Sequence, residues 1–96
     1  MTVMMLSLVY TNKYILFIKS MTCLACGGTP VDPDHLEAVG MGNCRGKPSF
    51  RDLSCVPLCR KCHTERHSLG ISDFEKKKNV NLWRWAFKLL RKHYLE

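Results

Sequence analysis

Two pairs of cysteines in the sequence share the spacing of a zinc knuckle. Both are CxxC motifs, 32 residues separate them, and their members are Cys23, Cys26, Cys59 and Cys62. Tetrahedral zinc takes four thiolate ligands, and paired knuckles supply them. Four unrelated buried cysteines are the alternative, but the shared spacing favours a metal. We therefore predict a structural Zn²⁺ whose binding energy contributes to folding.

Two histidines and an acidic segment form a second candidate cluster. His63 and His67 lie four residues apart in a stretch without glycine or proline, so a helix would place both imidazoles on one face. This pair alone is a weak signal, because exposed helix histidines are common. The turn-like segment VDPDHLEAVG carries Asp34 and His35 close after the first knuckle. A zinc cluster would bring the two parts together, so we interpret the segment as half of an active site.

The N-terminal 20 residues bear on the cellular compartment. They lack the basic start, unbroken apolar stretch and cleavage site of a signal peptide, and their apolar runs are too short to cross a bilayer. We therefore expect reduced thiols, a cytoplasmic protein and no membrane partner. Cys44 and Cys55 lie outside the CxxC pairs and are expected to be small buried apolar residues.

Composition favours a polyanionic partner. The chain has 96 residues, 15 lysines and arginines against 8 acidic residues, and a net charge of +7. This length suits one small domain, for which a metal would be a useful cross-link. Nucleic acid is the partner that the charge favours, although a basic domain without such a partner has the same composition.

The elements that must position these residues make a small α+β domain. Residues 3–10 and 14–18 are rich in β-formers and flank a turn-like TNK, which predicts a hairpin. Residues 22–58 hold every proline and most glycines, which predicts turns and short strands. A short helix should follow and end at Gly70. A capping box at Ser72 and Glu75 predicts a longer helix over 73–95, weakest at KNVN.

Basic side chains gather in two places. Arg45, Lys47 and Arg51 follow a glycine-rich loop, where they could contact phosphates or simply be solvated. The last helix has a basic stripe that could face a DNA backbone, formed by Arg84, Lys88, Arg91 and Lys92. Its opposite side is expected to pack as core, with base stacking on Trp83 and Trp85 as the alternative. The apolar residues of that side are Leu82, Trp83, Ala86, Phe87, Leu89, Leu90 and Tyr94.

Together these motifs resemble those of the HNH endonucleases. The residues that carry the resemblance are DH, a glycine-rich loop, CVP and LCRKCHTERH, over roughly residues 22–78. The whole run is similar to a phage subgroup, the recombination-enhancement or RecA-dependent nucleases. The resemblance implies a ββα-metal, treble-clef-like module at 21–70, stapled by zinc. Residues 1–20 would then be an N-terminal extension, and residues 71–96 a basic amphipathic C-terminal helix.

The resemblance also implies a role for each site residue. Asp34, His63 and His67 would bind a catalytic divalent ion, which could be Mg²⁺, Mn²⁺ or Zn²⁺, and His35 would be the general base. The asparagine usual in the family, which orients the base through backbone contacts, is replaced here by Ser54. Asp52 could substitute as a partner of His35.

The resulting prediction is a metal-dependent HNH endonuclease that hydrolyses DNA with low sequence specificity. The resemblance implies a phage-type enzyme linked to recombination, with DNA and a recombinase filament as partners in the host cytoplasm. Two alternatives remain open. One is a catalytically inactive, zinc-stabilised DNA-binding module, which Ser54 supports. The other is a zinc-scaffold adaptor whose basic stripe binds acidic proteins.

Overall fold

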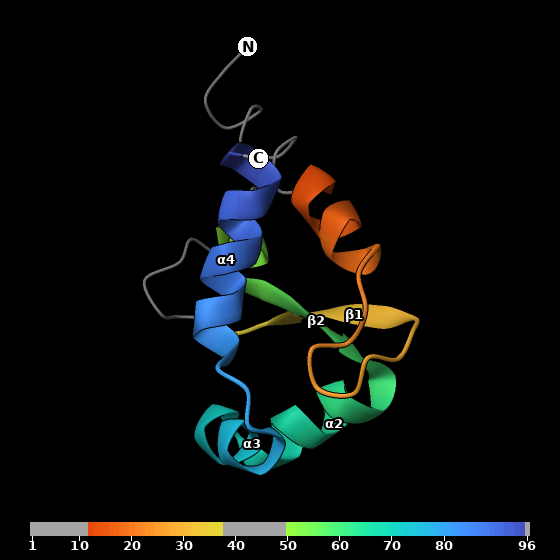
Figure 1. Ribbon diagram of the computed structural model, residues 1–96, viewed down its shortest axis with the longest axis vertical. Helices are drawn as coiled ribbons and strands as arrows, with labels where there is room; N and C mark the ends of the chain where they lie inside the picture. The colour runs from red at the N-terminus through yellow and green to blue at the C-terminus, as the bar shows by residue number, and fades with distance from the viewer. Residues whose placement is uncertain (1–11, 38–49, 96) are drawn as a thin grey trace.

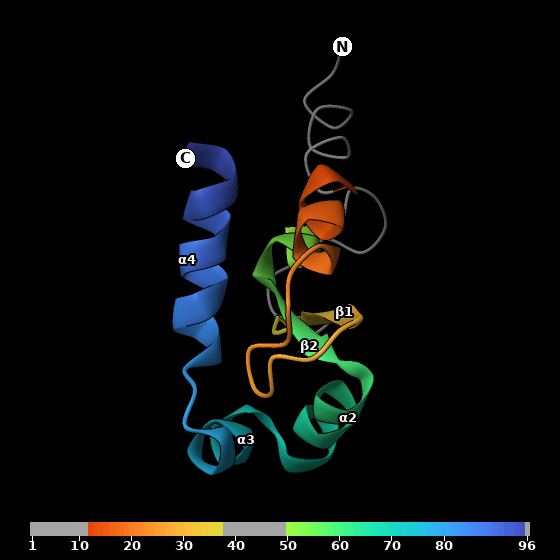
Figure 2. The ribbon, with the colours of Figure 1, turned by 45° about the vertical axis from the view of Figure 1, so that its right-hand side comes forward.

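The computed structural model describes residues 12–37 and 50–95, which form a small α+β fold (Figure 1). In these residues a two-stranded sheet lies among helices, and α4 runs along one side of the molecule (Figure 2). The elements in chain order are a helix at residues 12–19, β1 (Val31–His35), the 3₁₀ helix η1 (Phe50–Ser54), β2 (Cys55–Cys59), α2 (Arg60–Leu69), α3 (Ile71–Lys78) and α4 (Leu82–Leu95).

The two strands and α2 form the centre of the fold. β1 and β2 pair antiparallel, with Asp34 opposite Val56 and His35 opposite Cys55. α2 follows β2 without a break, so the strand–strand–helix order that was expected is present. The prediction of a turn at the DPDH sequence is wrong, because these residues are part of β1. A proline is tolerated there because β1 is an edge strand of the two-stranded sheet that the described residues form.

The prediction of an N-terminal hairpin is wrong for the residues that the structure describes. Residues 12–19 are helical, so the second strand, predicted at 14–18, is absent, while the first, at 3–10, lies outside the described residues. Tyr14 and Ile18, one helical turn apart, are both buried and cluster with Leu89 of α4. A short apolar run fits a strand or a buried helix equally well, and packing against α4 decides for the helix.

The short helix before Gly70 is confirmed, but the long helix after it is wrong. α3 begins directly after Gly70, which has a φ of 84° and makes no side-chain cap, so the predicted capping box is absent. Asn79 then adopts a left-handed conformation with φ of 53° and ends α3. Glu75 instead accepts a hydrogen bond from the Leu82 backbone N–H at 2.6 Å and so caps α4.

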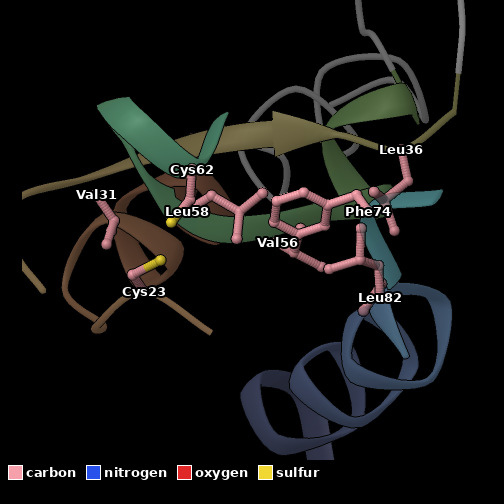
Figure 3. Packing of buried hydrophobic residues seen from close by; sticks show 9 residues of the cluster. Cys23, Val31, Leu36, Val56, Leu58, Cys62, Phe74 and Leu82 are labelled. Atoms are coloured by element: carbon pink, nitrogen blue, oxygen red, sulfur yellow. The ribbon is translucent and has the colours of Figure 1, made fainter. Parts of the chain in front are cut away.

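An apolar cluster joins the sheet to the C-terminal helices. Val56 and Leu58 of β2 are buried with Phe74 of α3 and Leu82 of α4 (Figure 3). The same cluster includes Cys23 and Cys62, so the cysteine pairs border the core. In the part of the chain that the structure describes, no helix has the length and apolar character needed to cross a membrane.

Candidate active site and metal centres

The four cysteines of the two knuckles come together at the start of α2. Their sulfur atoms all lie within 4.8 Å of one another, and those of Cys26 and Cys59 are 3.6 Å apart. The first knuckle is a turn in which the Gly27 backbone N–H donates to the Cys23 carbonyl at 2.9 Å. Gly27 has a φ of 77°, which suits glycine. The cluster could hold a zinc ion, as the sequence predicted.

The electrostatics of the thiols also favour a cation at this cluster. Burial would raise the pKa of Cys23, but backbone N–H groups of Cys59, Cys26 and Ala25 lower it to about 7. Burial and the neighbouring cysteines raise the pKa of Cys62 above its ordinary value. One thiol therefore ionises readily, and its negative charge disfavours ionisation of the next thiol. A bound dication would remove this repulsion between thiolates.

A second cluster combines one carboxylate with two imidazoles, as predicted. His63 Nε2 and His67 Nε2 lie 3.5 and 3.4 Å from Asp34 Oδ1, and 3.0 Å from each other. Asp34 comes from β1 and is fully buried, whereas the histidines come from α2 and His67 is exposed. Carboxylate and imidazole ligands fit Mg²⁺, Mn²⁺ or Zn²⁺, and three ligands leave coordination positions free for water and substrate.

The sequence analysis missed Asp32 as a partner of this cluster. His63 Nδ1 lies 3.3 Å from Asp32 Oδ2, and the Arg60 guanidinium lies 3.1 Å from the same oxygen. A carboxylate that accepts the Nδ1 proton leaves the His63 Nε2 lone pair facing Asp34 and His67. The signal was available, because Asp32 and Asp34 are two residues apart in one strand and so share a face.

Arg66 is a second residue that the sequence analysis missed. Its Nε donates to Asp34 Oδ2 at 2.7 Å, and its Nη2 donates to Asp34 Oδ1 to complete a bidentate pair. The same Nη2 lies 3.3 Å from the His35 carbonyl oxygen and 3.2 Å from His67 Nε2. Because Asp34 has no exposed surface, this guanidinium balances its charge and fixes the plane of its carboxylate.

His35, which follows Asp34 in β1, forms a dyad with Asp52. His35 Nε2 and Asp52 Oδ1 are 2.7 Å apart, and the two side chains are 28% and 22% exposed. A carboxylate at this distance favours the tautomer with the proton on Nε2, which leaves Nδ1 as a base. The partner expected for His35 is therefore in hydrogen-bonding position.

Ser54 makes backbone contacts rather than a contact with the base. Its hydroxyl donates to the Arg51 carbonyl at 2.7 Å and accepts from the Glu37 backbone N–H at 3.0 Å. It therefore ties the end of β1 to η1, which carries Asp52. Arg51 adds a hydrogen bond from Nε to the Glu37 carbonyl at 2.9 Å. A serine hydroxyl thus supplies backbone contacts between the two segments that hold the His35–Asp52 dyad.

The basic residues predicted to bind nucleic acid are placed in part. Arg45 and Lys47 lie outside the described residues. Of the two cysteines outside the CxxC pairs, Cys44 also lies outside the described residues, and Cys55 is buried as expected. Arg84, Lys88 and Arg91 are exposed on α4.

The core predicted for the other side of α4 is only half right. Leu82, Ala86 and Leu89 are buried, but Trp83 and Phe87 are 44% and 66% exposed. Leu90 is partly buried, and Tyr94 is exposed. The aromatic residues lie to the flank of the buried stripe, so the helix has a narrower core face than the sequence pattern indicated.

Comparison with known proteins shows the family to which the chain belongs. A family model described as "Putative HNHc nuclease" matches residues 1–91. The chain belongs to this HNH nuclease family. A curated relative, "Uncharacterized protein YdfU" of Escherichia coli K12, is 40% identical over 57 residues, which cover 59% of this chain and 16% of that protein. The chain thus spans about a sixth of that relative's length. No solved structure matches the chain.

Proposed function

We propose that this HNH protein is a metal-dependent endonuclease that hydrolyses DNA phosphodiester bonds. The observation that carries the proposal is that consecutive residues of β1 belong to two groups, because Asp34 meets His63 and His67 while His35 pairs with Asp52. Phosphodiester hydrolysis needs the phosphate charge neutralised, a water activated and the leaving oxyanion stabilised. A ligand set with free positions beside a base matches all three needs.

A divalent ion held by Asp34, His63 and His67 would neutralise the phosphate and stabilise the leaving oxygen. The remaining work falls to the protein's own side chains. His35 Nδ1 accepts the proton of the attacking water, since an imidazole exchanges protons near neutral pH. Asp52, hydrogen-bonded at 2.7 Å to Nε2, stabilises the resulting imidazolium. By analogy with the family, the products carry a 5′-phosphate and a 3′-hydroxyl.

Low sequence specificity follows from the kind of contact available. The cations assigned to DNA are phosphate contacts, which position a protein but carry no sequence information. They are Arg45, Lys47, Arg51, Arg84, Lys88 and Arg91. The similarity to phage nucleases of the recombination-enhancement type supports a role in recombination and a recombinase filament as partner. Under this proposal the enzyme works in the cytoplasm of a bacterial host.

Plasmid cleavage tests the proposal directly. Supercoiled plasmid should be nicked or linearised only when Mg²⁺, Mn²⁺ or Zn²⁺ is added to protein that already holds its zinc. The ends should be ligatable without kinase treatment, as 5′-phosphates are. His67→Ala serves as the matched control, because it should lose metal affinity while the four-cysteine zinc stays bound. Plasmid and single strands left intact under every ion, with a recombinase filament also supplied, would contradict the proposal.

The second candidate function is a zinc-stabilised DNA-binding module without catalysis. Ser54 in place of the family asparagine favours it. The contacts of the Ser54 hydroxyl to the Arg51 carbonyl and the Glu37 N–H argue for the nuclease, since they link the two halves of the dyad. Salt-dependent DNA binding without cleavage, in the same plasmid experiment, would select the module.

A further inference from the structure

We propose that the exposed aromatic face of α4 binds unpaired bases of a nucleic-acid strand. Trp83 and Phe87 would stack on the bases, and Arg84, Lys88 and Arg91 would take the phosphates. The proposal rests on the proposed function and deepens it by naming a single-stranded segment as part of the substrate. It defines an aromatic platform made of these five residues.

The first observation is the position of the two rings. Trp83 and Phe87 are four residues apart, so they are neighbours on the helix surface. They are 44% and 66% exposed, whereas Leu82, Ala86 and Leu89 of the same helix are buried. Exposed aromatic pairs of this kind mark binding surfaces when they adjoin a polar rim.

The second observation is that the rings and the cations share one hollow. An open hollow of about 540 Å³ is lined by Asn81, Trp83, Arg84, Phe87, Lys88 and Arg91. A smaller hollow of about 160 Å³ also involves Trp83 and Phe87, and its wall includes Leu53 and Ser54 of η1. The smaller hollow is mainly apolar, so the two rings border an apolar hollow at η1 and a larger hollow that is lined by the basic residues of α4.

The third observation is charge. α4 contains none of the chain's 8 acidic residues. Within residues 12–37 and 50–95, Arg84, Lys88 and Arg91 form no ion pair, and Lys88 Nζ lies 5.0 Å above the ring of Trp85. A second copy of this helix would present the same positive charge and be repelled. Phosphates between stacked bases match the alternation of cations and rings.

A single strand fits this platform better than a duplex. Stacking on a side chain needs a base face that duplex DNA keeps inside its own stack. The platform also borders the active site through η1, because Ser54 lines the smaller hollow and Asp52 of the same 3₁₀ helix partners His35. A strand held on α4 would therefore lie beside the element that positions the base.

Tryptophan fluorescence can read the platform directly, because the chain has 2 tryptophans, Trp83 and Trp85. Trp85→Phe leaves Trp83 as the reporter, and Trp83→Phe leaves Trp85. Zinc-loaded protein without added divalent ion would be titrated with a thymidine oligonucleotide of about 12 nucleotides, a length that such platforms span. The expected result is strong quenching of Trp83, little quenching of Trp85, and weaker quenching of Trp83 by a duplex of equal length.

Affinity gives a second readout with a matched control. Trp83→Ala should weaken oligonucleotide binding about 10-fold, the loss expected for one stacked base. Trp85→Ala removes a tryptophan of similar exposure, 39%, from outside both hollows, and should cost at most the few-fold of a lost cation–π contact. Arg84→Ala and Arg91→Ala should each lower the salt slope of single-strand binding by roughly 0.7.

Equal quenching of the two tryptophans, or unchanged affinity in Trp83→Ala, would overturn the platform. So would a dimer in sedimentation that Trp83→Ala dissociates, since the face would then be a self-association surface. These outcomes separate from those of the nuclease proposal, because quenching needs no added divalent ion. Quenching without any cleavage contradicts the nuclease alone, and normal cleavage without Trp83 quenching contradicts the platform alone.

Discussion

The two candidate metal centres both include residues of α2, but their ligand sets differ in number and in exposure. Cys62 and His63 are adjacent in α2, yet one belongs to the cysteine cluster and the other to the carboxylate–imidazole cluster. The first cluster has four cysteines, which could complete the tetrahedron of a zinc ion, and two of them are buried against the core. The second has three ligands and an exposed histidine at its edge. A complete set of four ligands suits a structural site, and a set with free positions suits catalysis. The cysteine cluster is therefore called the closed centre, and the carboxylate–imidazole cluster the open centre.

The largest expected effect is loss of the fold when the closed centre is broken. Cys59→Ser should remove zinc and most of its contribution to folding, which is on the order of 10 kcal/mol for structural sites. Thermal unfolding with elemental analysis measures both. Cys55→Ser is the matched control, because Cys55 is fully buried but outside the cluster, and it should keep its zinc with a loss of about 1–3 kcal/mol. A stable, zinc-free Cys59→Ser protein would contradict the comparison.

The next effect concerns the base and should leave both metal centres intact. His35→Ala should slow plasmid cleavage by a factor on the order of 10² to 10⁴, the usual contribution of a general base. Zinc content and Mn²⁺ binding, followed by calorimetry, should stay near the wild-type values because His35 ligates neither ion. Cleavage that remains within a few-fold of wild type would assign the base to another residue.

A smaller effect is expected from breaking the buried ion pair of the open centre. Arg66→Leu would leave Asp34 charged and without its bidentate partner, which costs about 3–5 kcal/mol for buried pairs. Denaturant unfolding measures the loss. Added Mn²⁺ should restore part of it in this variant by binding Asp34, whereas the same addition to Cys59→Ser should not. Stability equal to wild type would show that Arg66 does not balance Asp34.

The smallest effect is expected from replacing Asp32, the carboxylate that contacts the candidate ligand His63. Asp32→Ala should lower divalent-ion affinity at the open centre by about 10- to 100-fold, as loss of an outer partner of a ligating histidine does. Titration with Mn²⁺ checks this value. Arg60→Ala is the control, since its side chain is 84% exposed and the Asp32 contact to His63 remains. Equal effects of the two changes would mean that Asp32 does not orient His63.

Both ligand sets could be predicted because their signals are local. CxxC and HxxxH spacings follow from turn and helix geometry, and Asp34 followed from the resemblance. Asp32 was missed because its segment was expected to be a turn, whereas it is a strand that puts Asp32 on the same face as Asp34. Arg66 was missed because its contact with Asp34 depends on how α2 packs against β1, which no local pattern encodes. The errors at 14–18 and 73–95 have different origins, one in long-range packing and one in a local backbone conformation. Packing of Tyr14 against α4 and the left-handed Asn79 decided those segments.

The charge of the closed centre would affect the electrostatic potential at the open centre. Zinc with four thiolates carries a net charge of about −2, so the cysteine cluster would be an anion when it holds zinc. Cys62 and His63 are consecutive residues and belong to the two clusters, so their Cα atoms lie about 3.8 Å apart, which is less than the Debye length of about 8 Å. The filled cysteine cluster would therefore attract a dication to its neighbour and repel DNA. Arg60 and Lys61, both exposed on α2, carry positive charge that would offset part of that repulsion.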